Sequence, residues 1–202
     1  DPGEGKLGGW GESTRSQGGP DCGLTNPFPP ASFARMPDMK HVLFVCTGNT
    51  CRSPMAEGLF RKAVEGREDF EVSSAGIAAS KGTPSNPETA ALLKKRGVAL
   101  DGFGSRQVSE TILSKATHVF AMTLGHLQAL EDRFPHHSDK FYLVCEFAET
   151  AGNKVGTGTD VPDPIGMGRR AYEEVADTFD VAIPTIIAYI DQTWKAADSP
   201  GD

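Results

Sequence analysis

HVLFVCTGNTCRSP, residues 41–54, is the stretch that decides the fold of this chain. Its apolar run at residues 41–46 has the length and continuity of a central parallel strand that is buried on both faces. Gly48 and Asn49 come next, and both residue types tolerate the positive φ values that a tight curl needs. The Ser-Pro pair that ends the stretch is typical of a helix start, as a cap and a first-turn proline. The stretch therefore predicts a strand, a short loop and a helix in immediate succession.

Strands and helices continue to alternate along the rest of the chain. Further strands are expected at residues 71–74, 117–122 and 141–144, and further helices at 86–97, 124–134 and 172–190. Pro184 lies inside the last of these and should kink that helix or divide it in two. Strands that alternate with helices form a parallel sheet between two helical layers. We predict an α/β fold with a central four-stranded parallel sheet, helices on both of its faces, and a phosphate loop between the first strand and the first helix.

Residues 1–38 differ from the rest, because glycine and proline dominate their composition. Such a composition favours a disordered tail or linker over a packed core. Residues 39–197 are expected to form one domain, which is long enough for a core of its own.

Charge and cysteine content exclude several classes of protein. The net charge of −7 argues against a nucleic-acid binder, and no apolar run approaches the roughly 20 residues of a membrane span. Four cysteines are too few for a disulfide scaffold, and no His/Cys cluster suggests a metal: Cys22, Cys46, Cys51 and Cys145. We expect a cytoplasmic monomer that needs no metal or cofactor.

The loop after the first strand has the chemistry of an oxyanion site. In a strand-to-helix loop of this length, backbone N–H groups can turn inward around a tetrahedral anion, and the helix adds its positive end. A thiol at Cys46 is expected to ionise readily there and to act as a nucleophile. Arg52 can bind two phosphate oxygens at once. Substrate contacts are expected from the remaining loop residues: Thr47, Gly48, Asn49, Thr50, Cys51 and Ser53.

Residues 46–53 resemble the signature loop of the low-molecular-weight protein phosphatases, and the resemblance extends over residues 41–194. It implies an enzyme that removes phosphate from proteins through a phosphocysteine intermediate without a metal. The resemblance also implies that Asp163, which precedes Pro164 in an Asp-Pro pair, is the general acid. Asp160 is a rival because it is near, but no proline follows it.

The resemblance bears on two further features of the loop. An adjacent cysteine can form a reversible disulfide with the nucleophile in this family, so Cys51 is expected to pair with Cys46 on oxidation. Tyrosine-directed relatives often carry a loop-bracing His in the stretch that matches residues 103–108, which has none. The hydrogen bonds that support Asn49 must then come from elsewhere, and Ser74 is a candidate.

Within the family, a branch that cleaves phosphoarginine resembles this chain most. Tyrosine-directed members commonly carry an aliphatic residue where this chain has Thr50, and often an aromatic residue where it has Ile165. A phenyl ring favours stacking aromatics, whereas a guanidino group needs hydrogen-bond acceptors such as the threonine hydroxyl. Phosphoarginine is therefore the predicted substrate, and phosphotyrosine is the alternative.

Other classes fit the sequence less well. Thiol-linked arsenate reductases share the loop but need resolving cysteines after the second helix, and residues 98–116 contain none. A phosphopeptide-binding module without activity would be expected to lose the thiol, the arginine or the acid. The pair His136-His137 is expected to be a solvated surface pair and not part of a metal site.

Overall fold

The computed structural model describes residues 39–150 and 160–197, so the tail predicted at residues 1–38 lies outside the described part. Four parallel strands form one sheet in the order β2-β1-β3-β4. Their bounds are Lys40–Cys46 for β1, Phe70–Gly76 for β2, His118–Ala121 for β3 and Phe141–Leu143 for β4. The predicted parallel sheet is confirmed.

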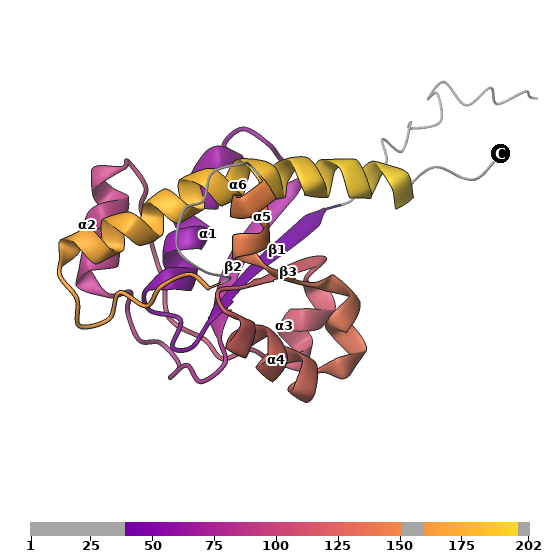
Figure 1. The fold of residues 1–202 in the computed structure, drawn as a ribbon, viewed down its shortest axis with the longest axis horizontal. Helices are drawn as coiled ribbons and strands as arrows, with labels where there is room; N and C mark the ends of the chain where they lie inside the picture. Colours follow the sequence, from indigo (N-terminus) through magenta and orange to yellow (C-terminus); the bar gives the residue numbers. More distant parts are fainter. Residues whose placement is uncertain (1–38, 151–159, 198–202) are drawn as a thin grey trace, which may run out of the picture. The chain divides into compact units, whose positions relative to one another are not determined.

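Helices cover both faces of this sheet (Figure 1). One face carries α1 (Arg52–Ala63), α2 (Pro87–Lys95), α5 (Val144–Thr150) and α6 (Arg169–Ala197), and the other carries α3 (Glu110–Lys115) and α4 (Leu124–Arg133). The strand β1 is buried on both sides, because Val42 and Phe44 pack into the first layer while Leu43 and Val45 pack into the second. This explains the unbroken apolar run at the start of the sequence pattern, and the α/β fold is confirmed.

Short elements and one long helix differ from the expected pattern. The pattern did not predict α3, α5 or the 3-10 helix η1 (Pro135–Lys140), which are too short for a clear periodicity. Pro184 lies inside α6, and the alternative that it divides this helix is wrong. Apolar residues on both sides of it, Ile183 and Ile186, are buried in the same core, and this packing holds one continuous helix.

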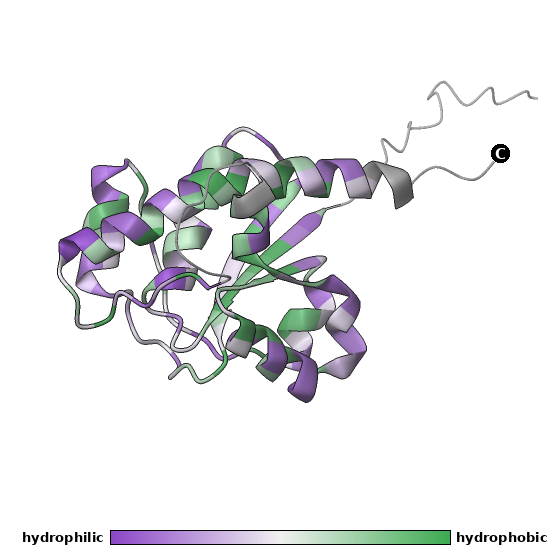
Figure 2. Cartoon of the chain, in the orientation of Figure 1, coloured by the Kyte–Doolittle hydropathy of each residue, from purple (hydrophilic) through white to green (hydrophobic). Residues whose placement is uncertain are grey.

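The hydropathy of the fold follows its layers. The strands of the sheet are mostly hydrophobic in Figure 2, and the helices show polar residues along part of their surface. Within residues 39–150 and 160–197, no helix is both long and apolar enough to cross a membrane.

A cluster of charged side chains lies at the start of β1. The Lys40 ammonium donates to Asp69 at 2.8 Å and to Asp191 at 2.7 Å. Arg67 donates to the same two carboxylates, and its guanidinium lies 4.4 Å from the centre of the Phe70 ring. Because Asp191 belongs to α6, this ion cluster ties the last helix to the edge of the sheet where β1 and β2 begin.

Candidate active site

The thiol of Cys46 ends β1 and is buried, with 3% of the residue exposed. Its Sγ lies 3.0 Å from the hydroxyl oxygen of Ser53, which belongs to the first turn of α1. A hydroxyl at this distance can donate a hydrogen bond to a thiolate and stabilise it. The strand, the loop and the helix thus bring this thiol to the positive end of α1.

Asn49 provides the sharp curl of the loop, with φ of 54°. Gly48, the other residue of a type that tolerates a positive φ, does not adopt one, so the curl depends on the asparagine. The loop also needs space from β2: a Cβ on Gly76 would come within 2.5 Å of the Thr47 carbonyl oxygen and 2.9 Å of the Asn49 nitrogen. Gly76 therefore permits the loop to lie against the end of β2.

Ser53 has a different role from the expected helix cap. The helix α1 begins at Arg52 after Cys51, and no side chain caps it. Pro54 does lie in the first turn, as predicted. The serine hydroxyl is inside the helix and contacts Cys46 instead, so it serves the thiol and not the helix end.

The side chain of Asn49 is fully hydrogen-bonded and fixes the loop. Its amide nitrogen donates to Ser53 Oγ at 3.0 Å and to Ser74 Oγ at 2.8 Å, and its oxygen accepts from the backbone N–H of Arg106 at 2.9 Å. The suggestion that Ser74 supports Asn49 is confirmed. The Arg106 amide supplies the remaining support in the stretch where the sequence lacks a bracing histidine.

Glu57 sets the direction of these hydrogen bonds. The Ser74 hydroxyl donates to its carboxylate, which is buried and also bonded to Arg61 at 2.6 Å. Since an ionised carboxylate only accepts, the Ser74 proton is used there, and its oxygen is free to accept from Asn49. Asn49 in turn donates to Ser53, so the Ser53 proton can be donated either to Cys46 Sγ at 3.0 Å or to the Ala75 carbonyl at 3.4 Å, and the thiol is the nearer of the two acceptors. No sequence pattern indicates this role for Glu57, because a glutamate inside a helix usually faces solvent.

Arg52 and Asp163 form an ion pair at the same loop. The guanidinium donates to Asp163 Oδ2 at 2.8 Å and to the Val161 carbonyl at 3.2 Å. Arg52 is buried, whereas 47% of the Asp163 side chain is exposed. Asp160 lies elsewhere, because its carboxylate accepts from the Leu124 N–H at the start of α4, at 2.7 Å. Of the two rival carboxylates, only Asp163 bonds to Arg52.

Thr50 and Cys51 complete the loop. The Thr50 carbonyl accepts from Asn86 N at 2.7 Å, which joins the loop to the start of α2. The Cys51 thiol lies 3.7 Å from Thr50 Oγ1 and 3.9 Å from the Tyr172 hydroxyl. Burial raises the pKa of Cys51 above its ordinary value. Burial and the neighbouring thiol raise the pKa of Tyr172 to about 12.

His126, a position that was not among the predicted site residues, also contacts the loop. Its Nε2 lies 2.8 Å from Thr47 Oγ1, and its Nδ1 lies 2.8 Å from Thr123 Oγ1. A sequence signal exists for one of these contacts only: Thr123 is a typical N-cap residue three positions before His126.

The pair His136-His137 was predicted to be solvated at the surface. His136 is exposed, as predicted, whereas His137 is partly buried and lies 2.6 Å from Glu110.

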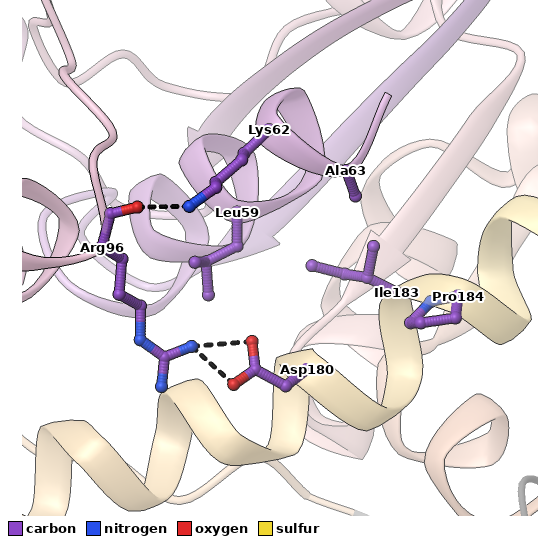
Figure 3. A pocket seen from close by; sticks show the side chains of 7 residues that line it. All are labelled: Leu59, Lys62, Ala63, Arg96, Asp180, Ile183 and Pro184. Carbon is purple, nitrogen blue, oxygen red and sulfur yellow. Dashed lines mark hydrogen bonds and ion pairs between the residues drawn. The ribbon is translucent and has the colours of Figure 1, made fainter. Parts of the chain in front are cut away.

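A cavity of about 470 Å³ lies at the opposite end of α1 from the loop (Figure 3). Its apolar floor includes Leu59 and Ile183, and its rim carries charged groups that bond to protein partners. Lys62 donates to the Arg96 carbonyl, and the Arg96 guanidinium pairs with Asp180. The cavity contains none of the loop residues and has no nucleophile, so it is a poor candidate for the chemistry.

Comparisons with known proteins agree with this geometry. The family model described as low molecular weight phosphotyrosine protein phosphatase matches residues 41–196, more than half of the chain. A protein-arginine-phosphatase of Geobacillus stearothermophilus is 37% identical over 143 residues, which cover 70% of this chain and 90% of the relative. A low molecular weight protein-tyrosine-phosphatase of Streptomyces coelicolor is 36% identical and covers 74% and 92%.

A solved structure is similar in the same way. The YwlE arginine phosphatase from Geobacillus stearothermophilus superposes with a TM-score of 0.67 at 32% identity, and the match covers 81% of this chain and 99% of that one. Fold and sequence thus agree over most of the described domain. The chain belongs to the low molecular weight phosphotyrosine protein phosphatase family and is a cysteine-dependent protein phosphatase.

Proposed function

We propose that this phosphatase acts through a phosphocysteine intermediate on Cys46 and removes phosphate from phosphoarginine in proteins. One observation carries the catalytic part of the proposal: Ser53 lies 3.0 Å from the Cys46 sulfur, in the same helical turn as Arg52, which bonds to Asp163. A nucleophile, an anion-binding cation and a proton donor therefore meet at one loop.

The first step is attack of the Cys46 thiolate on phosphorus. A sulfur–phosphorus bond forms, and the bond from phosphorus to the leaving nitrogen breaks while Asp163 gives that nitrogen a proton. Arg52 binds two equatorial oxygens and offsets their charge. A bound phosphate would compete with Asp163 for the Arg52 guanidinium, and Asp163 enters this step in its protonated form.

The second step releases phosphate. The Asp163 carboxylate takes a proton from a water molecule, which attacks phosphorus and breaks the sulfur–phosphorus bond. The electron pair returns to sulfur, where the Ser53 hydroxyl stabilises the thiolate. The remaining loop residues would hold the phosphoryl group: Thr47, Gly48, Asn49, Thr50 and Cys51. No metal takes part in this scheme.

The choice of phosphoarginine rests on the chemistry around the loop. Thr50 is half-buried and offers a hydroxyl where an aliphatic side chain would offer none. The residues after the Asp163-Pro164 pair that are exposed include Ile165 and Met167, neither of which is aromatic. Relatives of 36–37% identity are named for arginine and for tyrosine phosphatases, so phosphotyrosine is the second candidate.

Two measurements test this proposal. Wild type should hydrolyse para-nitrophenyl phosphate, and Cys46→Ser should not, because a serine hydroxyl is a weak nucleophile without a base. Phosphoarginine and phosphotyrosine peptides should then be compared, with Thr50→Ile expected to move the preference towards phosphotyrosine. A wild-type preference for phosphotyrosine of tenfold or more, about 1.4 kcal/mol in the transition state, would refute the substrate assignment.

We propose in addition that Cys51 protects the nucleophile by forming a disulfide with Cys46. Both thiols are free and buried in this structure. The test is peroxide treatment followed by disulfide mapping by mass spectrometry, and irreversible sulfonate on Cys46 without the link would count against it. The monomeric state and the cytoplasmic location stay predictions.

A further inference from the structure

The first turn of α4 contacts both halves of the proposed active site. The Leu124 N–H donates to Asp160, which begins the segment that leads to Asp163. Two residues further along the helix, His126 Nε2 lies 2.8 Å from the hydroxyl oxygen of Thr47, the loop residue after the nucleophile. One helical turn thus connects the loop to the segment that carries the proposed acid.

One tautomer of the His126 ring gives the Thr123 hydroxyl proton a partner. In this tautomer Thr123 Oγ1 accepts from the His126 backbone N–H at 3.2 Å and donates its own proton to His126 Nδ1 at 2.8 Å. A neutral imidazole that accepts at Nδ1 carries its proton on Nε2. Nε2 then donates to Thr47 Oγ1, and the Thr47 hydroxyl proton is left for another acceptor. This tautomer is assigned from the hydrogen-bond network.

His126 stays neutral in this environment. The residue is buried, with 9% exposed, and burial together with the Arg52 guanidinium lowers its pKa to about 4. The carboxylates of Asp160 and Asp163 oppose this shift but do not cancel it. Near neutral pH the imidazole therefore has one donor and one acceptor, as the assigned network requires.

We propose that His126 is a positioning residue that orients the Thr47 hydroxyl so that its proton is donated to the phosphorylated side chain at the loop. This role rests on the proposed function of that loop. Thr47 is exposed and follows Cys46 directly, whereas His126 is buried behind it and acts only through Thr47. Capping of α4 does not account for the contact, because Thr123 caps the helix and Nε2 is on the other side of the ring.

The test is a double-mutant cycle on kcat/KM. Thr47→Val removes the hydroxyl, His126→Met removes its donor, and each should lower kcat/KM about tenfold. Because the two residues act as one unit, the double variant should be no worse than either single variant. His126→Gln, whose amide can donate near the Nε2 position, should recover activity to within about threefold of wild type, and Thr47→Ser, which keeps the hydroxyl, should lose less activity than Thr47→Val.

Matched substitutions elsewhere control for general effects. His136→Met and Thr111→Val change the same residue types at exposed positions of η1 and α3, and both should keep wild-type kcat/KM. Thermal midpoints should be recorded for every variant. A normal midpoint with low activity, recovered by His126→Gln, indicates positioning and not loss of folding.

Several outcomes would overturn the inference. These are additive losses in the double variant, full activity of Thr47→Val, or failure of His126→Gln to recover activity while its midpoint is normal. If His126→Met does not fold, His126→Gln takes its place in the cycle, and the loss of up to threefold that it causes should vanish in the Thr47→Val background. The cycle is run with para-nitrophenyl phosphate, phosphoarginine and phosphotyrosine peptides. The coupling between Thr47 and His126 can then be measured even if phosphoarginine is not the preferred substrate. Activity retained by Cys46→Ser would instead refute the proposed function.

Discussion

The β1–loop–α1 unit has two ends that use polar groups in different ways. At the loop end, buried polar groups form a directed chain from Glu57 through Ser74 and Asn49 to Ser53, which contacts Cys46. At the opposite end, charged groups pair with each other in the ion cluster at the start of β1 and on the rim of the cavity near Arg96.

The difference teaches where chemistry can occur. The cavity end offers volume, but its charges are already satisfied by protein partners and none of them bonds to a nucleophile. At the loop end, a hydroxyl oxygen lies 3.0 Å from the sulfur of Cys46, and Arg52 pairs with Asp163, whose side chain is 47% exposed. Convergent donors with a defined direction, and not cavity volume, locate the site. Substitutions at the loop end should therefore change activity, and those at the far end should change stability.

The largest effect is expected at the loop end from Asp163→Asn. This near-isosteric change can still accept from Arg52 but cannot transfer a proton, so kcat should fall by about 10³-fold, within the range for loss of a general acid. The drop should be larger for substrates with poor leaving groups than for para-nitrophenyl phosphate. Steady-state kinetics with both kinds of substrate check this.

Asp160→Asn is the matched control for that variant. An asparagine oxygen still accepts from the Leu124 N–H, so kcat should stay within about threefold of wild type. Equal losses for both variants would mean that Asp163 acts by charge alone, and the assignment of the acid would then be wrong.

A smaller effect is expected from Glu57→Gln, which removes the fixed donor-to-acceptor order of the hydrogen bonds between Glu57 and Ser53. The glutamine amide can donate to Ser74 Oγ, so the Ser74 proton no longer has a fixed acceptor and Arg61 loses its anionic partner. Loss of a hydrogen bond to a charged group costs about 2 kcal/mol, or about 30-fold in kcat/KM. Kinetics per folded molecule, with Glu65→Gln on the exposed segment after α1 as the control, check this. An unchanged kcat/KM would show that the donor-to-acceptor order of these hydrogen bonds does not affect catalysis.

Parts of the site could be predicted from sequence because they are local. The strand, the loop, the helix start and the proposed nucleophile Cys46 lie within residues 41–54, and the Asp-Pro pair marks Asp163 as the proposed acid. Other contacts join positions far apart, such as Thr47 with His126, 79 positions later, and no local pattern encodes them. Gly76 is similar, because its lack of a side chain matters only once β2 pairs with β1.

At the far end, Asp191→Asn should lower stability without changing activity. The free energy of unfolding should fall by about 1.5 kcal/mol, because Lys40 and Arg67 each lose an ionic partner in a partly buried cluster. Hydrogen bonds from Arg67 lower the pKa of Asp191 to about 2, against about 3.9 in an unfolded chain. Its contribution is complete above about pH 5 and is lost as the pH falls towards 2.

Urea unfolding at pH 7 and pH 3 checks both parts of that prediction. The difference in stability between wild type and Asp191→Asn should shrink at the lower pH, because acid protonates the wild-type carboxylate. A difference that stays constant with pH would mean that the charge of Asp191 does not contribute. A change in kcat/KM would show that the two ends of the unit are not independent.

The smallest effect is expected at the cavity rim from Arg96→Met. Arg96 pairs with Asp180 and, at 3.4 Å, with Asp177, whose side chains are 50% and 66% exposed, so water screens both pairs and their loss should cost no more than about 0.5 kcal/mol, or about 2 °C in Tm. The methionine keeps most of the apolar contact of the arginine stem. The atoms that lose their partner belong to α6 and take no part in the series of hydrogen bonds from Glu57 to Cys46. We therefore expect kcat/KM to change less than twofold. A threefold or larger change with an unmoved Tm would mean that α1 couples the cavity to the loop, and the contrast between the two ends would fail.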